Sequence, residues 1–181
     1  MIKTLKGLLT VAAKKDIRFY LNGIHVVRDS DGVVKLEASD GYAGMVLENM
    51  QHMFNVAPDT DVILCRVSLD NAIKMFGPKA TPPLSINNDG ARLGEHAVTL
   101  IDGRYPDIRR ALRIDSSGKC DEIGLNFEIL ATMCKACSLI CHDYTHKGGV
   151  FKMRDASEPL LIRRELTGGG KLIAAVMPMR L

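Results

Sequence analysis

The chain has 181 residues, with 24 lysines and arginines against 21 aspartates and glutamates, for a formal net charge of +3. This length suits one ordinary domain or two small ones, and a hydrophobic fraction of 46% argues against disorder. No apolar run approaches the roughly 20 residues of a membrane helix, so we expect no membrane span, and we recognise no signal peptide. Five cysteines, an odd number without regular spacing, indicate free thiols in a reducing cytoplasm.

Positive charge is concentrated at the start of the chain, where residues 1–18 carry five basic side chains and one acidic one. With about 3.6 residues per turn, one face of a helix here would hold basic and small residues, and the opposite face apolar ones. These sets are Lys3, Lys6, Gly7, Thr10 and Lys14, and Leu5, Leu8, Leu9 and Ala12. The pattern predicts an amphipathic helix with a basic stripe. Three interpretations of this stripe are open: an ordinary solvated face, a face that binds phosphates, or a face that lies on a membrane surface.

Short strands and turns follow, and the pattern of one helix with several strands occurs three times. After the first helix we expect strands at 17–22, 33–39 and 43–47. The second unit is expected to have a strand at 62–67, Ser68 as N-cap, a helix at 69–76 and strands at 84–87, 91–94 and 97–101. The third is expected to have a strand at 122–125, Asn126 as N-cap, a helix at 127–141 and strands at 150–154, 160–165 and 171–178. Hairpin turns are expected at 40–41, 89–90 and 157–159. Because each helix needs a sheet to cover its apolar face, the predicted fold class is α+β. An odd number of units suggests completion by another chain.

Three stretches of the sequence are distinctive: YLNG at 20–23 with ASDG at 38–41, DGRYPDIRR at 102–110, and VMPMRL at 176–181. Together they resemble the bacterial DNA polymerase III beta subunit, the sliding clamp. The resemblance covers essentially the whole chain. Residues 1–113 resemble the family's middle domain and residues 114–181 the second half of its last domain, without the first domain or the first half of the last. It implies the DNA clamp fold, in which twelve half-domains form a ring with helices lining the hole, so three units per chain predict a homotetramer.

The resemblance implies a non-catalytic processivity factor in the cytoplasm that encircles duplex DNA and tethers a DNA polymerase during replication. Such a protein should contact phosphates with lysines and avoid base edges, and we recognise no base-reading motif in the sequence. By analogy the lysines lining the ring would be Lys3, Lys6 and Lys14, with Lys74 and Lys135 on the other two helices as further candidates.

The resemblance also implies a hydrophobic pocket that binds short linear motifs of polymerases and clamp-loader-type proteins. Its residues would be Leu21, Ser39, Gly41, Pro106, Arg110, Ala111, Asn126, Val176, Met177, Pro178, Met179, Arg180 and Leu181. Methionine suits a surface that accepts varied partners, and Arg110 with Asn126 would hold the peptide backbone. The other interpretation of Val176–Met179 is a final core strand.

The chain departs from the family's usual residues in this region. Ala43 and Gly44 stand where arginine and leucine are usual, and Ile129 stands where an aromatic residue is common. A second functional interpretation is therefore a truncated clamp mimic, which would bind the host clamp or its partners as a regulator or decoy without encircling DNA.

A cluster of cysteines and histidines suggests zinc at first sight. Cys134, Cys137 and Cys141 begin a CxxC-x3-CH-x3-H run, and thiolates and imidazoles are the usual zinc ligands. However, these cysteines lie at i, i+3 and i+7 of the predicted third helix, which is typical of a buried stripe, so we predict no metal. His25 is interpreted as a packed histidine in a strand. With no catalytic motif recognised, we predict no enzymatic activity and no cofactor.

Overall fold

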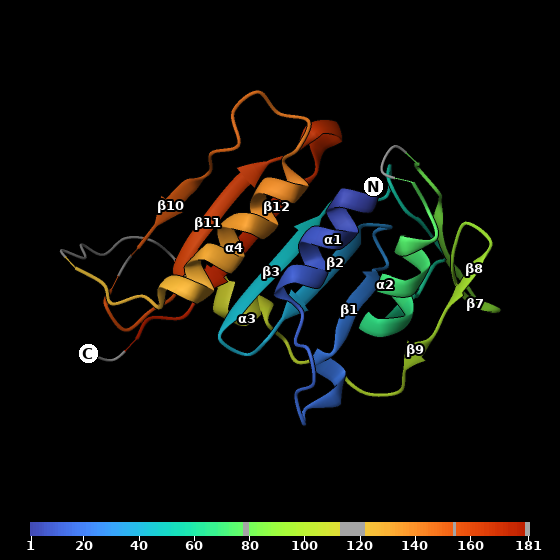
Figure 1. Cartoon of the computed structure of the whole chain (residues 1–181), viewed down its shortest axis with the longest axis horizontal. Helices are drawn as coiled ribbons and strands as arrows, with labels where there is room; N and C mark the ends of the chain where they lie inside the picture. Colours follow the sequence, from blue (N-terminus) through green and yellow to red (C-terminus); the bar gives the residue numbers. More distant parts are fainter. Residues whose placement is uncertain (78–79, 113–121, 154, 180–181) are drawn as a thin grey trace.

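The computed structural model describes residues 1–77, 80–112, 122–153 and 155–179. The boundary of the two predicted domains, between residues 113 and 114, lies outside these residues. Within them, eight strands form one antiparallel sheet in the order β10-β11-β12-β3-β2-β1-β5-β9 (Figure 1). These strands are β1 (Gly23–Arg28), β2 (Val34–Ser39), β3 (Ala43–Glu48), β5 (Asp61–Cys65), β9 (Leu100–Ile101), β10 (Val150–Lys152), β11 (Leu160–Glu165) and β12 (Lys171–Val176).

The sheet joins the first and third predicted units. Strand β12 pairs with β3 along its whole length, from Lys171 opposite Glu48 to Val176 opposite Ala43. The second unit contributes β5 and β9 to this sheet and forms a smaller one in the order β4-β6-β7-β8. The strands of the smaller sheet are β4 (Asn55–Val56), β6 (Leu84–Asn87), β7 (Gly90–Leu93) and β8 (His96–Val98). The α+β class and the helix-plus-meander units are confirmed.

Three helices lie on one side of the sheets, as Figure 1 shows: α1 (Ile2–Val11), α2 (Arg66–Lys74) and α4 (Phe127–Ile140). The predicted apolar face of α1 is buried against the sheet, with Leu5 and Leu8 fully inaccessible. Its predicted basic face needs two corrections. Gly7 is buried against α4, where an added Cβ would lie 2.7 Å from Cγ1 of Ile140, and Lys14 lies beyond the end of the helix. None of the described helices is long and apolar enough to cross a membrane.

Two predicted strands are not strands. Residues 122–125 have no regular structure, and residues 17–22 form a turn that contains a short 3-10 helix, η1 (Phe19–Leu21). The cause of the turn is Asn22, whose side-chain oxygen accepts hydrogen bonds from the backbone N–H groups of Lys15 and Asp16 at 2.9 Å. Its amide also donates to the Asp16 carbonyl at 2.9 Å. These local bonds compete with strand pairing.

One of the two predicted helix N-caps is confirmed and the other is wrong. Asn126 caps α4 as expected, because its side chain accepts from the N–H groups of Glu128 and Ile129. Helix α2 begins three residues earlier than predicted, so its N-cap is Cys65 rather than Ser68. The Ser68 hydroxyl instead accepts from the backbone N–H of Thr99 at 2.9 Å.

The segment that carries the motif DGRYPDIRR crosses the face of the large sheet that points away from the helices, a path that the sequence did not predict. This crossing segment, residues 102–112, ends in the short helix α3 (Arg109–Leu112). Tyr105 packs with Leu21 and Ile63 at one end, and Leu112 packs with Val46 and other outward-facing side chains at the other. The molecule therefore has three layers, with helices, sheet and crossing segment in that order.

Candidate peptide pocket and nucleic-acid face

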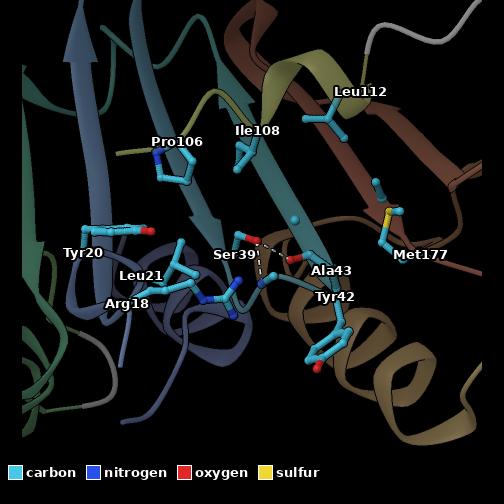
Figure 2. Close-up of a pocket in the computed structure, with 13 residues that line it drawn as sticks. Arg18, Tyr20, Leu21, Ser39, Tyr42, Ala43, Pro106, Ile108, Leu112 and Met177 are labelled. Carbon is cyan, nitrogen blue, oxygen red and sulfur yellow. Dashed lines mark hydrogen bonds between the residues drawn. The ribbon is translucent and has the colours of Figure 1, made fainter. Parts of the chain in front are cut away.

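An apolar pocket of about 250 Å³ opens between the crossing segment and the ends of the central strands. Figure 2 shows side chains from four parts of the chain pointing toward it: the η1 turn, the β2–β3 hairpin, the crossing segment and the end of β12. The lining residues are Arg18, Tyr20, Leu21, Ser39, Gly41, Tyr42, Ala43, Gly44, Pro106, Ile108, Leu112, Ala175 and Met177. A concave, mostly apolar surface with a few polar groups is typical of a ligand site.

The β2–β3 hairpin forms the floor of the pocket. The Ser39 hydroxyl donates to the Ala43 carbonyl at 2.7 Å and accepts from the Gly41 N–H at 3.0 Å (Figure 2). Gly41 has φ +92° and sits against the guanidinium of Arg18, so a side chain there would be both strained and obstructed. Gly44 leaves the floor open, since an added Cβ would make only ordinary contacts with Ile108 and Ser39.

Arg18 forms a polar rim on this pocket. Its Nε and Nη2 donate to the two carboxylate oxygens of Asp16 at 2.9 and 2.7 Å, and Nη2 also reaches the Asp40 carbonyl at 3.3 Å. These hydrogen bonds from Arg18 lower the pKa of Asp16 to about 2. The bidentate pair fixes the guanidinium plane beside an otherwise apolar opening.

A buried polar cluster fastens the crossing segment to the sheet. Glu37 on β2 is 1% exposed and forms an ion pair with Nε of Arg109 at 2.9 Å and a hydrogen bond with Nδ1 of His25 at 3.0 Å. Nε2 of His25 lies 2.8 Å from Asp61 on β5. The ring of Tyr105 stacks on the His25 ring, with centroids 4.7 Å apart. His25 is thus packed in a strand, as its sequence context indicated.

The structure brings five of the predicted pocket residues together at this site: Leu21, Ser39, Gly41, Pro106 and Met177. The others lie elsewhere. Val176 is fully buried in the core, and the side chain of Asn126 is engaged as the cap of α4. Arg110 and Met179 are exposed and Pro178 half-buried, all outside the lining, while the Ala111 side chain, Arg180 and Leu181 lie outside the described part of the chain.

Eight lining residues were not among the predicted ones: Arg18, Tyr20, Tyr42, Ala43, Gly44, Ile108, Leu112 and Ala175. A sequence signal existed for some of them. Ala43 and Gly44 follow the Asp40-Gly41 turn, so alternation along the strand places Gly44 on the same face as Ser39 across the hairpin.

The predicted DNA-contacting lysines are all exposed. Lys3 and Lys6 lie on the solvent side of α1, Lys135 on that of α4, and Lys74 at the end of α2. Lys74 is the least available, because it pairs with Asp70 one turn earlier at 2.7 Å. The three helices that carry or adjoin these exposed lysines lie on the side of the molecule opposite the crossing segment (Figure 1).

The cysteines of α4 differ from one another in burial. Cys141 is buried and Cys137 is half-buried, while Cys134 is exposed and does not belong to the predicted buried stripe. Burial raises the pKa of the Cys137 thiol to about 12. In the described ranges no group of three or more histidine, cysteine or acidic side chains is arranged to hold a metal ion.

The sequence matches no protein-family model and no curated protein, but the structure has clear relatives. A sliding clamp from Pseudomonas aeruginosa solved with a ligand superposes with a TM-score of 0.68 at 15% identity, over 99% of this chain and 64% of that chain. One from Caulobacter crescentus gives 0.65 at 17% identity, over 99% and 63%. The fold is that of a DNA sliding clamp. A third match, at 0.66 and 15% identity over 99% and 63%, is a P. aeruginosa clamp bound to griselimycin.

The chain thus spans 63 to 64% of the length of these clamps. Within that span the clamp fold accounts for both faces of the molecule described above. The helices occupy one side of the sheets, and the crossing segment with its apolar pocket occupies the other.

Proposed function

We propose that this protein is a DNA sliding clamp: a non-catalytic processivity factor whose chains close into a ring around duplex DNA and hold a DNA polymerase through the apolar pocket. The observation that carries the proposal is the separation of two surfaces in a clamp fold. Mobile lysines lie on the helical side, where they can meet phosphates without reading bases. The apolar pocket lies on the other side, where a bound peptide leaves the helical face free.

The proposed ring contains four chains. Each chain supplies three helix-plus-sheet units, and a ring of twelve units then needs four of them. Residues 1–113 would form one clamp domain and residues 114–181 half of another, which a neighbouring chain would complete. The mass in solution should be four times the 19.8 kDa of one chain by light scattering. A stable monomer or dimer, with no tetramer on DNA, would contradict the tetramer.

Topological retention on DNA tests the proposed function directly. The protein is incubated with nicked circular DNA, the complex is isolated by gel filtration, and half of it is cut once with a restriction enzyme. A ring stays on the closed circle and slides off the linear ends. A clamp mimic, which binds partners without encircling DNA, would show no difference between circular and linear DNA, and that result would overturn the proposal.

Peptide binding is expected to depend on Met177, whose side chain is 40% exposed and lines the pocket. Met177→Glu places a carboxylate in the apolar wall, so affinity should fall at least about tenfold, or 1.4 kcal/mol. The probes are griselimycin and a rhodamine-labelled hexapeptide ending in leucine and phenylalanine, measured by calorimetry and fluorescence anisotropy. Met179→Glu is the matched control, because Met179 is 45% exposed but outside the lining. Equal losses in both variants would place the binding site elsewhere.

A further inference from the structure

The strongest feature outside the pocket itself is the buried cluster behind its wall. The pocket residues Pro106, Ile108 and Leu112 all belong to the crossing segment. Two side chains of the same segment, Tyr105 and Arg109, contact the buried cluster on the sheet. The wall is therefore attached to the sheet by residues that do not themselves line the pocket.

The arrangement around His25 favours a proton on both ring nitrogens. Nδ1 lies 3.0 Å from a Glu37 oxygen and Nε2 lies 2.8 Å from an Asp61 oxygen. A neutral imidazole has one N–H, so it would turn a lone pair toward one of these carboxylates, whereas the imidazolium donates to both. Burial alone would lower the pKa of His25, but the hydrogen bonds that its ring donates to Glu37 and Asp61 outweigh burial and raise the pKa above its ordinary value.

Among the described residues, the charged and aromatic groups around this imidazole come from three elements. Strand β2 supplies Glu37, strand β5 supplies Asp61, and the crossing segment supplies Arg109 and the polar ring of Tyr105. Glu37 remains paired with Arg109 whatever the state of the histidine. Asp61 is 77% exposed and can turn to water when the imidazole is neutral. The contact that changes with the proton is the stack of Tyr105 on the His25 ring, because an aromatic face attracts a cation more than a neutral ring.

We propose that Glu37, His25 and Arg109 are positioning residues for the wall of the peptide pocket, and that peptide affinity falls as His25 loses its proton. This inference rests on the proposed peptide-binding function. The Glu37–Arg109 ion pair holds the wall at all pH values near neutrality, and the Tyr105 stack adds a second, pH-dependent attachment. The contribution of the protonated form is fully present below about pH 6.5, the usual pKa of a free histidine. It is lost as the pH rises through the higher pKa that His25 has in the folded protein.

The test measures peptide affinity at pH 6 and pH 9 in the wild type and in His25→Leu. The probe is the rhodamine-labelled hexapeptide, acetylated and amidated so that it does not titrate. Wild-type affinity should fall about thirtyfold, which corresponds to removal of a desolvated cation–aromatic interaction. His25→Leu should bind equally at both values, and His96→Leu, in the smaller sheet, should behave as the wild type. A flat wild-type profile, or a pH effect that survives in His25→Leu, would overturn the inference.

A second readout separates failure of this inference from failure of the proposed function. Hydrogen exchange protection of the amides in residues 105–112 should drop between pH 6 and pH 9 in the wild type and stay constant in His25→Leu, after correction for intrinsic exchange rates. If the wild type binds the hexapeptide at neither pH, peptide binding is refuted. The hydrogen-exchange protection of residues 105–112 then tests by itself whether the crossing segment is attached in a pH-dependent way. Unchanged protection in the wild type would then refute the pH-dependent attachment.

Discussion

Replacing Gly7 with valine is expected to lower the free energy of unfolding by about 3 kcal/mol, the upper part of the usual range for overpacking. The Cβ alone would lie 2.7 Å from Cγ1 of Ile140 and 2.9 Å from the backbone oxygen of Ala136, and backbone cannot yield as a side chain can. Helix propensity favours valine over glycine, so the loss of stability reports the clash between α1 and α4. Thermal unfolding should show Tm lowered by roughly 6–12 °C for a chain of this size.

The matched control is Gly148→Val, because nothing lies within 4 Å of a Cβ added at Gly148. Its stability should stay within about 0.5 kcal/mol of the wild type, as for most surface substitutions. The same substitution would also disturb the contact between the first and third units, because they meet through α1 and α4 and through β3 and β12. Unchanged stability in Gly7→Val would mean that α1 and α4 are not in close contact.

Apolar runs and turn signals predicted most of the elements, although the long strands do not alternate: β3, for example, is buried on both faces. The predicted strand at 160–165 is reproduced residue for residue as β11, and the predicted helix at 127–141 differs from α4 by one residue. Gly7 shows the limit of this reasoning. A glycine among lysines was placed on the basic face, but its lack of a side chain lets a second helix approach. The sequence around Gly7 does not indicate which helix that is.

The candidate site was predicted in part, since the five pocket residues found by resemblance lie on segments that carry the quoted motifs. The rest of the lining depends on how the crossing segment returns over the sheet. Ile108 and Leu112 lie on the segment that also carries Arg109, whose partner Glu37 is about seventy positions away in the sequence. No local pattern in residues 102–112 indicates that partner, and Glu37 alone looks like an ordinary polar position of a strand.

Reversing the charge of Lys3 and Lys6 together, to glutamate, is expected to have the largest effect on DNA. Both side chains are exposed on α1, so the folded structure should be unchanged. Affinity for duplex DNA should fall more than about tenfold at low salt, and the slope of log affinity against log salt should shrink by about 0.9 for each phosphate that is no longer neutralised. The measurement is DNA retention at a series of salt concentrations. Lys74→Glu should do less, because Lys74 is already paired with Asp70.

The control is Lys171→Glu, which reverses one lysine charge on the opposite face of the sheet, half of the charge change in the double variant. Lys171 is exposed at the start of β12, and its neighbour Leu172 points into the core beneath the helices, so alternation places Lys171 on the outer side. A long-range effect of net charge would weaken DNA binding in Lys171→Glu by about half as much, in logarithm of affinity, as in the double variant, whereas direct binding of phosphates on the helical side would spare Lys171→Glu. Normal DNA retention in the double variant would mean that α1 does not face DNA. The proposal that the helices line the hole of the ring would then lose its support.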